Sequence, residues 1–152
     1  HHEVEIVVRI NRLGKHIEER FASRYYEEIA LGIDFTARVL QEELRGKGLP
    51  WEKAKAFDGS AVISPFINKD HFPDLNNLNF HLDINGETRQ QGNTANMIFS
   101  IDQIISHVSK YFTLKIGDLI YTGTPEGVGP VAIDDRLRGY IEGENLFDFM
   151  VK

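Results

Sequence analysis

The chain has 152 residues, of which 41% are hydrophobic and 26% are charged, proportions typical of a single globular domain with a buried core. The net charge of −6, the lack of basic runs and the shortness of the apolar runs argue against nucleic-acid and membrane partners. Cysteine is absent, which excludes disulfides, thiolate metal sites and cysteine nucleophiles; because this fits a reducing compartment, we expect a cytoplasmic protein.

The first predicted element is a β-strand between Glu3 and Ile10. Apolar and polar residues alternate along it, and one face consists of Val4, Ile6, Val8 and Ile10. Glu3 and Glu5 leave the opposite face, with their side chains about 7 Å apart. Two carboxylates at this spacing can bind one hard divalent cation, although the same pattern more commonly marks a solvated strand face.

A helix is predicted next, between Asp34 and Gly48. Its apolar stripe consists of Phe35, Val39, Leu40 and Leu44, and glycines follow as helix stops. Asp34 directly precedes the helix and could add a third carboxylate to the pair on the first strand. Arg38 could instead pair with an acidic residue on its own helix, and Lys55, in a charged stretch, could simply be solvated.

The second half of the chain contains a hairpin, a helix and several short strands. Alternating apolar residues predict a strand from Leu78 to Ile84, which runs into Asn85-Gly86, a strong hairpin signal. Ser100 and Gln103 then form a capping box ahead of a second helix. The remainder, from Leu114 to Val151, is predicted to form short strands separated by turns. The layout is therefore α+β.

The stretch from Gly117 to Pro130 is the most informative, because an apolar strand ends there in a turn rich in glycine, proline and threonine. Backbone N–H groups around Gly123 and the hydroxyls of Thr122 and Thr124 are donors that suit a small carboxylate or carbonyl ligand. A phosphate loop is excluded, since no Lys-Ser/Thr follows the glycines and Pro130 opens no helix. A plain surface turn is the alternative that the spacing alone favours.

Five separated motifs occur in a specific order along the chain. They are His1-His-Glu-Val-Glu5, Gly32-Ile-Asp-Phe-Thr-Ala-Arg38 with Gln41, Lys47-Gly-Leu-Pro-Trp-Glu-Lys-Ala-Lys-Ala-Phe57, Met97-Ile-Phe99 and Thr122-Gly-Thr-Pro-Glu-Gly-Val-Gly129. In this combination the chain resembles the fumarylacetoacetate hydrolase family, most closely its small acylpyruvase/oxaloacetate decarboxylase branch. The resemblance implies one catalytic domain over residues 1–152, an α+β fold in which a mixed β-sheet forms a roll with two main helices, and a homodimer.

The resemblance also implies a set of site residues. Mg²⁺, or Mn²⁺ in its place, is expected on Glu3, Glu5 and Asp34. Lys55 matches the family's catalytic lysine beside the metal. The positions that match the family's substrate-binding residues are Arg38, Gln41, Gly123 and Thr124.

The reaction implied is hydrolysis or decarboxylation at a C–C bond of small 1,3-dicarbonyl acids, namely acylpyruvates and oxaloacetate, with the metal stabilising the resulting enolate. Three alternatives stay open. The first is an isomerase, decarboxylase or hydratase of a longer 2-oxo-diacid in aromatic catabolism, and the second is an oxaloacetate tautomerase. The third is a non-catalytic domain that only binds metal.

Two departures from the family pattern stand out. Val39 follows the Thr-Ala-Arg motif where many relatives carry aspartate, at a position we expect to be structural. The family's N-terminal portion, with a His and a Glu on a mobile lid, has no counterpart, and His1 and His2 do not replace that pair. The chain begins without Met, so we expect that the natural N-terminal segment is missing and that hydrolysis depends on it.

Overall fold

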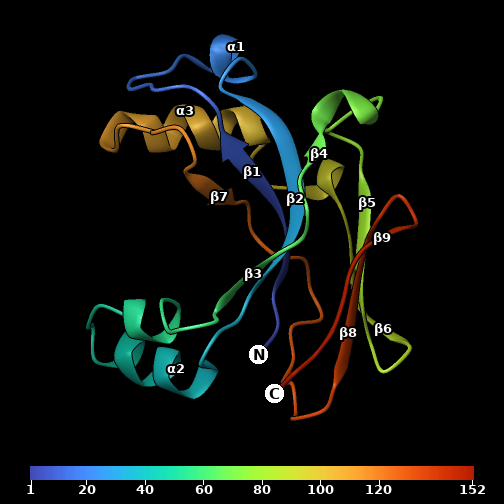
Figure 1. Cartoon of the computed structure of the whole chain (residues 1–152). Coiled ribbons are helices and arrows are strands. Elements are labelled where there is room, and N and C mark those ends of the chain that lie inside the picture. The colour runs from blue at the N-terminus through green and yellow to red at the C-terminus, as the bar shows by residue number, and fades with distance from the viewer.

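The computed structural model describes all 152 residues and contains two antiparallel β-sheets that share one core (Figure 1). The first sheet has the order β3-β2-β1-β7, with β4 also paired to β2, and the second has the order β6-β5-β8-β9. The first sheet contains β1 (Val4–Ile10), β2 (Tyr26–Asp34), β3 (Ala61–Ile63), β4 (Ile67–Asn68) and β7 (Leu119–Tyr121). The second contains β5 (Asn79–Ile84), β6 (Glu87–Asn93), β8 (Arg136–Ile141) and β9 (Glu144–Met150).

Helices and short 3-10 turns occupy the connections between strands. The helices are α1 (Glu19–Ala22), α2 (Arg38–Gly46) and α3 (Ile101–Tyr111), and the turns are η1 (Glu52–Ala54), η2 (Lys69–His71) and η3 (Thr94–Asn96). The predicted α+β class and roll are confirmed, but every strand pair is antiparallel, whereas mixed sheets were predicted. No helix in the structure is both long and apolar enough to span a membrane.

The core lies between the two sheets, where the apolar face of β1 meets that of the β5–β8 pair. The predicted face of β1 is confirmed, because Val4, Ile6, Val8 and Ile10 are all fully buried. Leu82 and Leu137 join them from the second sheet, and Ile105 from α3 packs into the same cluster. The opposite face of β1 is thereby left to carry Glu3 and Glu5 away from the core.

A predicted hairpin turn and a predicted helix cap are also confirmed by the structure. Asn85 and Gly86 both adopt positive φ, 54° and 87°, as a tight hairpin between β5 and β6 requires. The side chain of Ser100 accepts from the backbone N–H of Gln103, and the Gln103 side chain accepts from the backbone N–H of Ser100. This capping box fixes where α3 begins.

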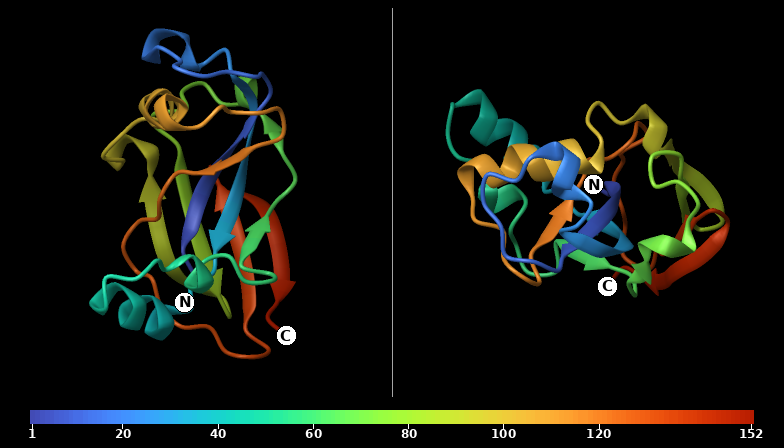
Figure 2. Two further views of the ribbon diagram at one scale, coloured as in Figure 1. Left: turned by 90° about the vertical axis from the view of Figure 1, so that its left-hand side faces the viewer. Right: turned by 90° about the horizontal axis from the view of Figure 1, so that it is seen from above.

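Helix α2 forms within the predicted range, but its apolar stripe does not enter the core. Val39 is 81% exposed and Leu40 is 36% exposed, and Gln41 is the buried residue of this helix. Figures 1 and 2 show α2 standing out from both sheets at the end where β2 stops. The helix therefore turns a polar side, with Arg38 and Gln41, toward the end of the first sheet.

Candidate metal centre and active site

Antiparallel pairing of β1 with β2 brings three carboxylates together. Val4 lies opposite Ile33 in the register, so Glu3 and Asp34 adjoin, and the backbone N–H of Asp34 donates to the carbonyl of Glu3 over 2.9 Å. Glu5 follows on the same face as Glu3. One carboxylate oxygen from each of Glu3, Glu5 and Asp34 lies within 4.8 Å of the other two. The structure thus assembles the three predicted metal ligands.

Glu5 is buried and has little compensation for its charge. Its Oε2 accepts one hydrogen bond, from the backbone N–H of Gly123 at 2.6 Å. Burial, helped by the neighbouring charges of Asp34 and Glu3, raises the pKa of Glu5 to about 7 against the opposing effect of that N–H. The ionised form of Glu5 is therefore favoured only when further positive charge lies nearby.

Lys55 is held between two of the carboxylates rather than solvated. Its Nζ donates to Glu3 over 2.7 Å and to Asp34 over 2.6 Å. The preceding Ala54 is fully buried, and its carbonyl accepts from the backbone of Ala37, which fixes the end of η1 beside the cluster. Burial would lower the pKa of Lys55, but the hydrogen bonds to both carboxylates outweigh it and raise the pKa above its ordinary value. The ammonium is therefore charged.

Arg38 also turns toward the cluster, and not toward the acidic residues of its own helix. It forms an ion pair with Glu3 and donates to Oε1 of Gln41 over 2.7 Å. Burial would raise the pKa of Glu3, but hydrogen bonds from Lys55 and Arg38 hold it below its ordinary value. Three carboxylates thus face two cations, and both cations contact Glu3.

The donor set fits a hard divalent cation. Mg²⁺ and Mn²⁺ take carboxylate oxygens and commonly keep several positions for water or substrate. Glu3, Glu5 and Asp34 supply three such groups. The ammonium of Lys55 lies between Glu3 and Asp34, so this position already attracts positive charge. The arrangement can therefore bind a divalent ion and a negatively charged ligand in one place.

The glycine-rich loop lies against the edge of β1. The hydroxyl of Thr124 donates to the carbonyl of Val4 over 2.9 Å, and that of Thr122 donates to the carbonyl of Ile6 over 2.8 Å. The Gly123 N–H points to Glu5. The structure thus places Gly123 and Thr124 beside the carboxylates. Both residues donate their hydrogen bonds to β1, and their role as substrate ligands stays a prediction.

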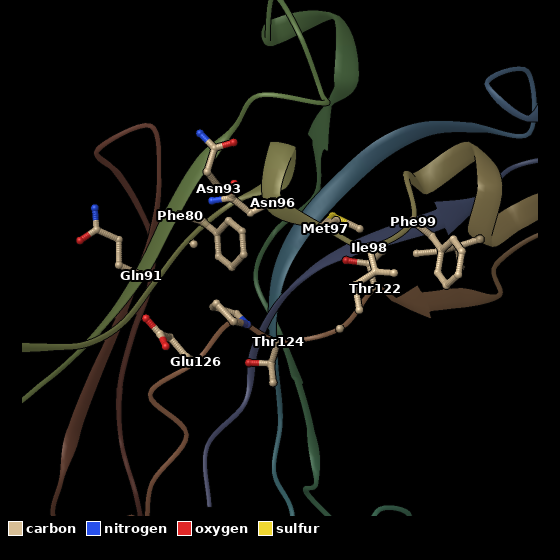
Figure 3. Close-up of a pocket in the computed structure, with 14 residues that line it drawn as sticks. Phe80, Gln91, Asn93, Asn96, Met97, Ile98, Phe99, Thr122, Thr124 and Glu126 are labelled. Atoms are coloured by element: carbon tan, nitrogen blue, oxygen red, sulfur yellow. The ribbon is translucent and has the colours of Figure 1, made fainter.

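A cavity of about 570 Å³ adjoins the loop (Figure 3). Thr122 and Thr124 line it on the loop, Phe80 on β5, and Met97 and Phe99 on the segment that follows η3. Gly123 connects the cavity with the carboxylate cluster, because it lines the cavity and its N–H donates to Glu5. The cavity thus lies beside the loop that contacts the carboxylates, although none of the three carboxylates lines it.

Sequence reasoning gave no role to two residues at this site, Tyr121 and Gln90. The phenol of Tyr121 donates to the carbonyl of Val62 over 2.9 Å, and its ring covers Gly32, where a Cβ would lie 2.6 Å from the ring. Burial and the charges of Asp34 and Glu5 raise the pKa of Tyr121 to about 12, so it stays protonated. Its place at the end of β7, directly before the loop, was the available signal. Gln90 is buried in the second sheet and its sequence context gave no signal.

Comparison with known proteins places these features in a family. Residues 1–147 match the family model described as fumarylacetoacetate (FAA) hydrolase C-terminal. The chain is 49% identical over 152 residues to the mitochondrial oxaloacetate tautomerase of Mus musculus, covering all of this chain and 69% of that protein. It is 43% identical over 155 residues to the mitochondrial oxaloacetate decarboxylase of Dictyostelium discoideum, covering all of this chain and 71% of that protein.

The fold is likewise similar to that of a solved relative. Fumarylpyruvate hydrolase from Pseudomonas aeruginosa, crystallised with Mn²⁺ and pyruvate, superimposes with a TM-score of 0.91 at 37% identity. The match covers 99% of this chain and 64% of that one.

Proposed function

The chain belongs to the fumarylacetoacetate hydrolase family, and from that membership we propose that it is a divalent-metal-dependent enzyme of small 1,3-dicarbonyl acids. Its substrates are oxaloacetate and acylpyruvates, and its reactions pass through an enolate. The observation that carries the proposal is the convergence of Glu3, Glu5 and Asp34, with Lys55 between two of them. The names of the mouse and Dictyostelium relatives support oxaloacetate as a substrate.

Mg²⁺ is the metal that we propose, with Mn²⁺ able to replace it, and Glu3, Glu5 and Asp34 would hold it. The Mn²⁺ bound to the Pseudomonas relative supports a divalent ion. When bound, such an ion supplies Lewis acidity to the oxygens of a keto acid.

The two cations of the site have distinct tasks. Arg38 presents a planar guanidinium, which suits the carboxylate common to every proposed substrate, and its bond to Gln41 orients it. Lys55 is a compact charge beside the carboxylates and stabilises the negative charge that develops on the enolate oxygen. Because both are already held by Glu3, neither has to be ordered when substrate binds.

One enolate chemistry accounts for both C–C cleavages. In oxaloacetate, the bond to the departing carboxylate breaks, CO₂ leaves, and the enolate of pyruvate takes up a proton. In an acylpyruvate, water adds to the acyl carbonyl, the C–C bond breaks, and a carboxylic acid leaves with the same enolate. Stabilising the enolate lowers the barrier of each reaction.

A second candidate is keto–enol tautomerisation of oxaloacetate, which the name of the mouse relative favours. This reaction moves a proton between C3 and the keto oxygen and breaks no C–C bond. It uses the same charges to stabilise the enolate, so it differs in products and not in the residues required.

The test is turnover of oxaloacetate and acetylpyruvate by the purified protein, with Mg²⁺ and with EDTA. Pyruvate formation measures cleavage of either substrate, and the decay of enol absorbance, corrected for pyruvate, measures tautomerisation. We expect Mg²⁺-dependent activity that falls at least 100-fold in Lys55→Met while metal binding is retained. Lys53→Met is the matched control, since Lys53 is exposed on the same turn, and it should be unchanged. Absence of all three reactions in metal-loaded protein would refute the proposal.

A further inference from the structure

Gln90 is a buried amide that connects the second sheet to the strand carrying the metal ligands. It belongs to β6, is 1% exposed and uses its full hydrogen-bonding capacity. Its Oε1 accepts from the backbone N–H of Val4 over 3.0 Å and lies 2.8 Å from Nδ1 of His2. Its Nε2 donates to Oγ1 of Thr124 over 2.8 Å and to the carbonyl of Pro125 over 3.0 Å.

The partners fix the orientation of this amide. The Val4 N–H can only donate and the Pro125 carbonyl can only accept, so the oxygen of Gln90 must face β1 and the nitrogen must face the loop. Thr124 then donates to the carbonyl of Val4. The result is a closed ring of three hydrogen bonds from Val4 to Gln90, from Gln90 to Thr124 and from Thr124 back to Val4.

This ring lies where β1 has no neighbouring strand. β7 pairs with β1 from Val7 to Arg9 only, so no strand pairs with this edge of β1 at Val4. Buried backbone groups without partners are costly. Gln90 and Thr124 satisfy both backbone groups of Val4, the residue between the two predicted ligands Glu3 and Glu5.

We propose that Gln90 is a positioning residue of the metal centre. Acting through Val4 and Thr124, it fixes the main chain between Glu3 and Glu5 relative to the loop, so that both carboxylates and the N–H of Gly123 keep one arrangement. The inference rests on the proposed metal-dependent function, because it assigns Gln90 a task at that same site. Gln90 itself reaches neither the carboxylates nor the cavity.

The test compares variants that break the ring with a variant that breaks an equivalent bond elsewhere. Gln90→Met and Thr124→Val keep the size of the side chain and remove its hydrogen bonds, whereas Thr124→Ser keeps the hydroxyl. Thr94→Val is the matched control. This buried threonine, like Thr124, accepts one hydrogen bond and donates one: it accepts from the backbone N–H of Leu78 and donates to the carbonyl of Leu75, but it follows the far end of β6.

Mn²⁺ affinity by electron paramagnetic resonance, kcat and KM for oxaloacetate, and stability to urea are measured for each variant. We expect Gln90→Met and Thr124→Val to weaken Mn²⁺ binding at least 10-fold, and Thr124→Ser to recover most of that loss. Thr94→Val should lose comparable stability and keep its Mn²⁺ affinity within twofold. The recovery and the control separate positioning from general destabilisation.

Two results would overturn the assignment. One is folded Gln90→Met protein with Mn²⁺ affinity and kcat within twofold of the unaltered protein. The other is a loss of affinity that follows stability equally in Thr94→Val and the ring variants. If the unaltered protein itself neither binds Mn²⁺ nor turns over substrate, the proposed function fails instead, and the two failures are thus distinguishable.

Discussion

At the scale of single residues, the site is defined by an imbalance of charge around Glu5. Lys55 and Arg38 both contact Glu3, and Lys55 also contacts Asp34, whereas Glu5 receives only the N–H of Gly123. A buried carboxylate in this position either binds a proton or requires a further cation. A divalent ion meets that requirement, so metal binding and the protonation of Glu5 should compete.

This competition predicts how the stability of the metal-free protein depends on pH. Because the folded-state pKa of Glu5 is raised to about 7, its contribution to stability is full below the unfolded pKa of about 4.3 and is lost as the pH rises through 7. The loss is on the order of 3 kcal/mol. Urea unfolding in EDTA between pH 5 and about pH 8 should therefore show wild-type stability falling relative to Glu5→Gln.

The Glu5→Gln variant provides the reference, since its amide resembles the protonated acid and cannot titrate. Other groups, such as His2, whose pKa burial lowers, titrate in both proteins and cancel in the difference. Saturating Mg²⁺ should abolish the wild-type loss at high pH. Parallel pH profiles for the two proteins in EDTA would contradict this explanation.

At the scale of elements, the pairing of β1 with β2 brings the three carboxylates of the site together. Glu5 lies opposite Gly32, which has no side chain, and the ring of Tyr121 occupies the space above that glycine. A Cβ on Gly32 would come within 2.6 Å of both Tyr121 and Val7. The glycine is thus required by close approach and not by its backbone angles.

We accordingly predict that Gly32→Ala destabilises the protein by roughly 1–3 kcal/mol and weakens Mn²⁺ binding, because Tyr121 must move. Gly46→Ala in α2 is the comparison, since nothing lies within 4 Å of its would-be Cβ, and it should be neutral or stabilising by up to about 1 kcal/mol. Urea unfolding and Mn²⁺ titration measure both effects. Equal stabilities of the two variants would contradict the role assigned to Gly32.

At the scale of the whole molecule, local patterns predicted the elements whose signals lie within a few neighbouring residues. The alternation along β1, the Asn85-Gly86 hairpin and the capping box at Ser100 each follow from neighbouring residues, and the structure confirms them. β2 was not predicted, because its residues from 29 to 33 are buried on both faces and do not alternate. The apolar stripe of α2 was predicted but its exposure was not, since amphipathic periodicity does not say whether a partner is present.

The site could be predicted only in part for a similar reason. Spacing alone placed Glu3 and Glu5 on one face, but the nearness of Asp34 and Lys55 depends on strand pairing and on η1, which are long-range features. Only the family resemblance indicated that Asp34 and Lys55 belong to the site. Gln90 was missed, because its partners are more than 30 residues away. The homodimer stays a prediction, which sedimentation equilibrium would test.

Anomalous diffraction from crystals of this protein soaked in Mn²⁺ would test the metal centre itself. We expect one strong peak in the anomalous difference map, within coordination distance of carboxylate oxygens from Glu3, Glu5 and Asp34. No peak at these carboxylates at saturating Mn²⁺, or a peak bound only by other residues, would contradict the metal centre and with it the proposed chemistry.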